Sequence, residues 1–432
     1  MRKWFASVMS TTAVRTAVVL LFMVICVSCG ETYRPVATPI APNPPNPGFS
    51  HVAMVISVNG SSHPGASTSI DVSGDTAVSQ STVGLMPVHA AVVQNGTRVY
   101  VANSGDDTVA SFSPTSAAPV TTVSLPTGST PSFVGTTELG TLYVANFGNN
   151  TVSAISTTSN VIEPPLSGIP VGVHPVSLAE TPNHQALYVA NRGNGGSGGS
   201  VTSVNPFDRS VNPPVANATW VSPVSVLARS DSNRVFVLDQ GTGLVSPINT
   251  ASNAVPQCGN NPCGTSVGVG ANFMLYDPTR NRLYVSNPAN NTVTYLDAST
   301  DALPAVVIPV ANPIAVAALP DGSRAYISSA AVSGGNVTSR VTVINGADGS
   351  VKTTIPLTTV AQICASSPSE LPIAAVADSS RVYVGNCDAG NVAIIQTLSD
   401  TLLLQMAAPL SSSFSANGTP LPQNPVFVVA GP

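Results

Sequence analysis

A short apolar pattern followed by a polar turn recurs along the chain. Its clearest copy is residues 142–152, where Leu-Tyr-Val-Ala-Asn is followed by the turn Phe-Gly-Asn-Asn and then by Thr-Val. β-Branched and aromatic residues bounded by Gly and Asn predict a strand, a tight turn and the start of a second strand. Six further copies are centred on Tyr100, Tyr188, Phe236, Tyr284, Tyr326 and Tyr383. Recurrence of this kind predicts a repeat architecture.

Each repeat contains more than the recurring strand. An apolar run precedes it, as in residues 174–179, and two further strand patterns follow it, as in residues 292–297 and 305–310. The repeats recur at intervals of 42 to 57 residues. Four antiparallel strands at this spacing are typical of a propeller blade, so the sequence predicts an all-β fold, a β-propeller.

The number of blades follows from the spacing. Tyr100 to Tyr383 spans six repeats in 283 residues, about 47 each, and residues 51–432 leave room for eight. Residues 424–429 predict a single first strand without the rest of a blade. Residues 52–57, 69–72 and 78–83 predict the other three strands of a blade whose first strand is missing. Pairing them would close the ring and leave no open sheet edge. We expect eight blades closed by N- and C-terminal strands, with seven as the alternative if these end strands do not pair.

The first 50 residues have a different composition. Residues 1–28 begin with Arg2 and Lys3 and contain an apolar run at residues 18–25, which is typical of an export signal. The segment ends at Cys29 and resembles a bacterial lipoprotein signal, which implies that Cys29 carries the lipid. An ordinary signal peptide or a membrane anchor is the alternative. Residues 29–50 are rich in proline and predict an extended tether, so residues 51–432 are left as the propeller domain.

Charge narrows the function classes. Charged residues make up 8% of the chain and its formal net charge is −5. No stripe of Lys and Arg is present that could contact phosphates, so nucleic-acid binding is disfavoured.

The repeat resembles the YVTN family of bacterial β-propeller repeats. Residues 143–146, Tyr-Val-Ala-Asn, match the motif with Ala in place of Thr, and the resemblance covers roughly residues 85–400. It implies a surface or secreted propeller, and it places the chain near the lactonase-like propellers. No catalytic motif of those lactonases can be placed on this chain, so the resemblance carries over no activity.

Four cysteines remain beyond the signal and the lipid candidate. In an exported protein an even remainder predicts disulfides. Cys258 and Cys263 flank a short loop, and Cys364 and Cys387 lie in two loops that should emerge on one face of the same blade. A metal site is disfavoured because no histidine is near either pair.

Candidate chemistry is sparse. His89 and His174 stand at equivalent places near first strands, hence toward the axial channel, and Asp239 replaces the repeated Asn on another blade. They are candidate channel residues, although structural turn residues are the commoner case. We expect no catalytic residue, cofactor or metal to be identifiable from sequence.

The sequence therefore predicts an exported, lipid-anchored propeller of the outer membrane or cell surface. Its predicted role is a binding scaffold for an envelope protein or polysaccharide, attached to the membrane through its lipid. The alternative is a lactonase-like hydrolase with a site in the axial channel.

Overall fold

The computed structural model describes residues 52–93, 96–115, 119–136, 140–364, 371–407, 410–414, 420–422 and 424–431. All of them belong to one compact unit, Gly48–Pro432. The predicted signal, Cys29 and the predicted tether lie outside the described residues. Among the described residues there is no helix of sufficient length and apolar character to cross a membrane.

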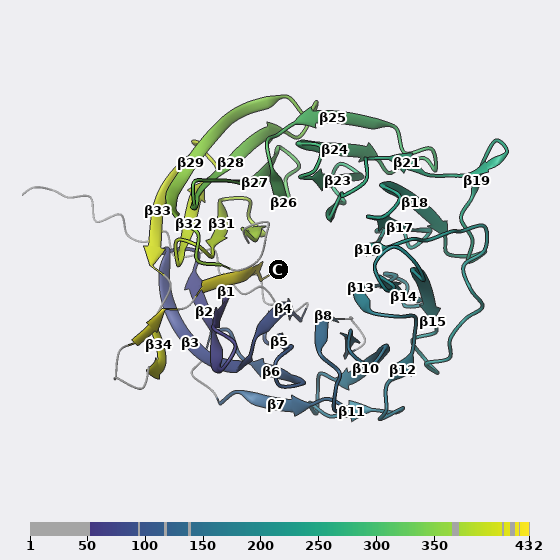
Figure 1. Cartoon of the computed structure of the whole chain (residues 1–432), viewed down its shortest axis with the longest axis horizontal. Helices are drawn as coiled ribbons and strands as arrows, with labels where there is room; N and C mark the ends of the chain where they lie inside the picture. Colours follow the sequence, from purple (N-terminus) through teal and green to yellow (C-terminus); the bar gives the residue numbers. More distant parts are fainter. Residues whose placement is uncertain are drawn as a thin grey trace, which may run out of the picture. The chain divides into compact units, whose positions relative to one another are not determined.

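Eight antiparallel sheets are arranged around an axis, each with its first strand innermost (Figure 1). The structure is therefore an eight-bladed β-propeller, as the repeat spacing predicts. Blade 1 consists of β36 (Asn424–Ala430), β1 (Val52–Asn59), β2 (His63–Asp71) and β3 (Thr76–Leu85), and blade 2 of β4 (Pro87–Val92), β5 (Val99–Asn103), β6 (Thr108–Phe112) and β7 (Thr121–Ser124). Blade 3 consists of β8 (Pro131–Thr136), β9 (Thr141–Asn146), β10 (Thr151–Ser156), β11 (Ile162–Glu163) and β12 (Ile169–Pro170), and blade 4 of β13 (Pro175–Glu180), β14 (Leu187–Asn191) and β15 (Ser200–Val204).

The second half of the ring repeats this arrangement. Blade 5 consists of β16 (Pro223–Ala228), β17 (Arg234–Asp239), β18 (Leu244–Asn249) and β21 (Thr265–Ser266), and blade 6 of β22 (Phe273–Asp277), β23 (Arg282–Asn287), β24 (Thr292–Asp297) and β25 (Ala305–Pro309). Blade 7 consists of β26 (Pro313–Ala318), β27 (Arg324–Ser333), β28 (Asn336–Asn345) and β29 (Val351–Ala361), and blade 8 of β30 (Ile373–Ala375), β31 (Arg381–Asn386), β32 (Asn391–Gln396) and β33 (Thr401–Ala407). Two small hairpins, β19 (Gln257–Cys258) with β20 (Asn261–Pro262) and β34 (Leu410–Phe414) with β35 (Pro420–Pro422), stand apart from the blades.

The ends of the described chain close the ring. Strand β36 is the inner strand of blade 1 and pairs antiparallel with β1, Val55 opposite Val428 and Ile56 opposite Phe427. The predicted closure is confirmed. It removes the open edge that β1 would otherwise present.

Blade 4 differs from the others at its outer edge. Beyond β15 a single β-bridge joins Val204 to Val211, and the Asn212 N–H donates to Ser203 O.

The repeated tyrosines form the core between blades. Each is at most 1% exposed, namely Tyr100, Tyr143, Tyr188, Tyr284, Tyr326 and Tyr383. Several of their hydroxyls donate to the neighbouring blade. Tyr100 reaches Asn160 Oδ1 at 2.9 Å, and Tyr383 reaches Asp75 Oδ1 at 3.0 Å across 308 positions of sequence. The repeat is thus a sheet-to-sheet contact that also satisfies the buried hydroxyl.

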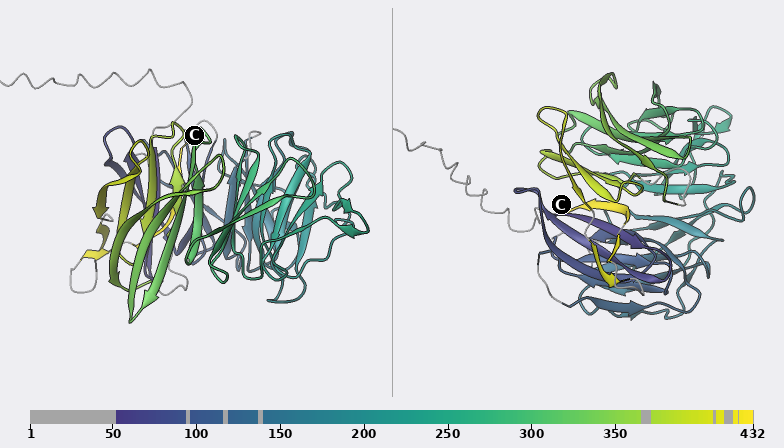
Figure 2. Two further views of the ribbon diagram at one scale, coloured as in Figure 1. Left: turned by 90° about the horizontal axis from the view of Figure 1, so that it is seen from above. Right: turned by 60° about the vertical axis from the view of Figure 1, so that its left-hand side comes forward.

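The blades present two different faces, seen at the two ends of the strands in the side view (Figure 2). The turns between second and third strands and the loops that join blades share one face, which we call the loop face; for example, the Ser104 N–H donates to Met86 O. The turns between first and second and between third and fourth strands share the other, where the Thr157 N–H donates to Gly140 O.

The described chain enters the ring at this second face. Val52 pairs with Asp71, beside the turn between β2 and β3, and its carbonyl accepts a bond from the Gly431 N–H. Strand β1 then crosses to the loop face, where Val58 pairs with Asn424.

Candidate functional site

The ion pairs of the described residues are concentrated on one of the two faces. The ion pairs between described residues lie at the face opposite the loop face, which we call the ion-pair face. They include Arg381–Asp75, Arg324–Asp400, Lys352–Asp400, Arg234–Asp301, Arg229–Asp231 and Arg209–Glu163. Most of these pairs join one blade to the next, so their role is to hold blades together.

Aspartates on the loop face are engaged with backbone. Asp107 accepts the N–H groups of Gly128 and Thr130, and Asp388 accepts those of Ile363 and Cys364. These carboxylates fix the loops that lead into the next blade, which is the ordinary work of Asp at a turn.

A depression of about 580 Å³ opens on the loop face. It lies where blades 8, 1 and 2 meet, at the loop-face ends of the inner strands β36 and β4. Among the described residues none that lines it is charged; these are Val58, Gly60, Ser61, Met86, Pro87, Val88, Ile363, Cys364, Cys387, Asn424 and Val426. We call it the loop-face depression. Three of its apolar side chains are well exposed, Met86 by 42%, Val88 by 37% and Ile363 by 59%.

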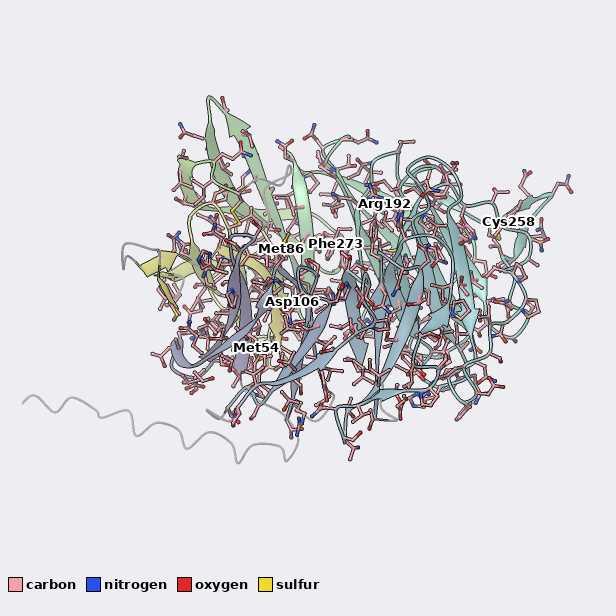
Figure 3. All side chains as sticks on the ribbon, turned by 60° about the horizontal axis from the view of Figure 1, so that its bottom comes forward. Met54, Met86, Asp106, Arg192, Cys258 and Phe273 are labelled. Carbon is pink, nitrogen blue, oxygen red and sulfur yellow. A yellow bond between two sulfur atoms is a disulfide. The ribbon has the colours of Figure 1, made fainter. Side chains whose placement is uncertain are left out.

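A disulfide forms part of its wall. Cys364 precedes β30 and Cys387 follows β31, and their Cα atoms are 6.1 Å apart. The predicted pairing is present in the structure, and so is Cys258–Cys263, which closes the β19–β20 hairpin at the outer edge of the ring (Figure 3). The first of these bonds restrains the loop that carries Ile363.

A second cavity, of about 470 Å³, lies along the axial side of the inner strands β22, β26, β30 and β36. Its walls are almost entirely apolar, with Phe273, Leu275 and Phe427 among the larger side chains. Its main polar groups are at one end, where Asp277 Oδ1 already accepts the N–H groups of Thr279 and Arg280.

His89 is enclosed by aromatic rings. Its imidazole stacks on Phe133 at 3.9 Å between ring centroids and lies 4.3 Å from the ring of Phe427. The Val134 N–H donates to Nδ1 (3.4 Å), so the ring proton is on Nε2. Burial lowers the pKa of His89 to about 3 because it disfavours the charged imidazolium. The ring is therefore neutral at neutral pH.

His174 and Asp239 each have structural partners. His174 Nδ1 is 2.9 Å from Gly193 O, to which it donates, and its ring stacks on Phe147. Asp239 is 1% exposed and accepts the N–H groups of Val221 and Ser222, both at 2.8 Å.

The three candidates lie on different blades, and the described residues contain no group of three or more His, Cys, Asp or Glu that could hold a metal ion. The structure thus places them in three separate environments, and the two histidines are not at equivalent positions, because His89 lies within β4 whereas His174 immediately precedes β13.

Sequence reasoning missed the residues of the loop-face depression. Met86 precedes the proline that begins an inner strand, and the same position on other blades is polar, with Thr130, His174 and Asn312. An apolar residue at this place was the available signal. Ile363 and Val426 gave none, because they join the depression only when the ring closes.

Comparison with known proteins identifies the fold alone. No family model and no curated protein matches the chain, so the resemblance to YVTN repeats stays a prediction. Among solved structures, AztD from Citrobacter koseri is 13% identical with a TM-score of 0.61, over 88% of this chain and 98% of that one. A putative 6-phosphogluconolactonase from Bacteroides fragilis is 12% identical with a TM-score of 0.53, over 90% and 99%. Hydrazine synthase from Kuenenia stuttgartiensis is 17% identical with a TM-score of 0.50, over 68% and 92%. Likenesses at this identity support a propeller scaffold and no particular activity.

Proposed function

We propose that the protein is an exported, lipid-anchored propeller of the cell envelope that binds an envelope protein or polysaccharide through its loop face. The observation that carries this proposal is the loop-face depression, whose described lining is largely apolar and uncharged and which lies on the face opposite the ion pairs of the described residues. Exposed apolar surface of this kind marks binding sites in soluble domains.

Export is supported by the cysteines. Disulfides persist in oxidising compartments, and the four cysteines of the propeller form two of them. The lipoprotein-like sequence before Cys29 adds the lipid anchor, and the outer membrane or cell surface is its proposed location.

The side chains proposed for a hydrolase have other partners. His89 is held neutral between Phe133 and Phe427, and Asp239 is saturated by backbone N–H groups. These two side chains do not converge on one substrate position, so we favour a binding role for the protein over hydrolysis.

Two measurements test this function. An array of envelope polysaccharides and proteins probed with residues 51–432 should give binding that is lost when the depression is filled by Val88→Trp; an array without any signal would refute the binding role. Labelling of producing cells with an alkynyl fatty acid should mark the wild type and leave Cys29→Ser unlabelled. Equal labelling of both would refute the anchor.

A further inference from the structure

We propose that the loop-face depression docks apolar side chains of a protein partner, with Met86 as the main contact. This inference rests on the proposed function and deepens it by choosing protein over polysaccharide.

Met86 has a left-handed backbone, with φ of 48°. The same conformation occurs at the corresponding residue of other blades, with φ of 41° at Thr130, 56° at His174 and 46° at Asn312. Asn tolerates this region well, whereas a long apolar side chain is strained in it. Because the Met86 side chain is 42% exposed, folding gains little from it. Strain at an exposed apolar residue points to a contact made outside the fold.

The position of Met86 is fixed by its neighbours. The Ser104 N–H and Oγ–H both donate to Met86 O at 3.0 Å, and the Gly105 N–H donates to Leu85 O. Across the depression, the disulfide and Asp388 hold the backbone of Ile363 and Cys364. A surface held in this way loses little freedom when a partner binds.

The chemistry of the lining selects the partner. No described lining residue is charged, and five of them are aliphatic or Met, namely Val58, Met86, Val88, Ile363 and Val426. A charged group brought here would lose its hydration without meeting an opposite charge. The hydroxyls of a polysaccharide would find few side-chain hydrogen-bonding partners in the described part of the lining, whose polar side chains are Ser61 and Asn424. Aliphatic and aromatic anchors seated in a pocket are typical of protein partners, and Met suits a surface that adapts to them.

A random twelve-residue peptide display library, selected on immobilised residues 51–432, tests this inference. We expect enriched peptides to carry aliphatic or aromatic residues and few charges. A synthetic copy of the best peptide should bind Met86→Asn at least tenfold more weakly than it binds the wild type. Thr130→Asn is the control, because it introduces the same residue at the corresponding position of the next blade, outside the depression, and its affinity should stay within twofold of wild type.

Stability measurements exclude misfolding as the cause. Met86→Asn relieves backbone strain, so its urea midpoint should equal or exceed that of the wild type while its affinity falls. Selection of no peptide, selection of charged peptides, or equal affinity for wild type and Met86→Asn would each overturn the inference. Polysaccharide binding on the array without peptide selection would leave the proposed function standing and remove this inference. Peptide binding that depends on Met86, in a protein that carries no lipid, would support this inference and refute the lipid anchor of the proposed function.

Discussion

One hydroxyl group links the last blade to the first. Tyr383 donates to Asp75 Oδ1 at 3.0 Å, and Arg381 Nε lies 3.1 Å from Asp75 Oδ2. Asp75 is 8% exposed, so Tyr383→Phe leaves a buried carboxylate with one fewer partner. Loss of a hydrogen bond to a charged group costs about 1.5–3 kcal/mol. For a domain of this size that corresponds to a fall in Tm of about 2–4 °C.

Tyr188→Phe is the matched control for this prediction. Its hydroxyl donates to the neutral Asn253 Oδ1 at 3.2 Å, so its loss should cost about 0.5–1.5 kcal/mol. Urea unfolding of both variants, of Asp75→Asn and of Tyr383→Phe/Asp75→Asn gives the coupling energy between Tyr383 and Asp75, which should be about 1 kcal/mol or more. If Tyr383→Phe costs no more than Tyr188→Phe, or if the two changes are additive, the contact between blades 8 and 1 does not hold the ring closed.

Three further predictions concern closure and pH. Removing residues 424–432 takes away β36 and the buried Val428. The shortened chain should lose its cooperative thermal unfolding and aggregate through the exposed edge of β1. An unchanged melting curve would refute the closure. Burial raises the pKa of Tyr143 to about 12, above the value of about 10 in the unfolded chain, so its contribution to stability is complete below pH 10 and is lost as the pH rises further. Phenolate absorbance at 295 nm should therefore grow with unfolding, and ionisation of every tyrosine before the loss of circular dichroism would contradict this. The pKa of His89 is lowered to about 3 from about 6.5 in the unfolded chain, so the neutral ring contributes stability that is present above pH 6.5 and is lost as the pH falls toward 3. His89→Phe should therefore flatten the acid side of a plot of urea midpoint against pH. An unchanged acid side would rule out the enclosed neutral ring.

Local pattern was enough to predict the scaffold. The Tyr-Val-x-Asn strand recurs because each blade must pack on the next, and its tyrosines are indeed buried between sheets. Closure by residues 424–430 was predictable because an inner strand without a sheet and a sheet without an inner strand stood at opposite ends of the repeat. Cysteine arithmetic led to the two disulfides in the same way.

The candidate site could not be predicted by this route. Val58, Met86 and Ile363 are far apart in sequence and come together only through the closed ring. The concentration of ion pairs on one face was equally hidden, since Arg381 and Asp75 become partners only after closure. His89 and His174 were selected as candidates because of their residue type. Their stacking on Phe133 and Phe147 depends on contacts with neighbouring blades, which no local pattern specifies.

Hydrogen–deuterium exchange of residues 51–432 with and without a selected peptide tests most directly whether this propeller binds through its loop face. The account predicts slower exchange at residues 58–61, 86–88, 363–364 and 424–426, with no change at the ion-pair face. Protection confined to the turns of the ion-pair face around Arg229 and Arg324, or to the axial strands β22 and β26, would contradict it.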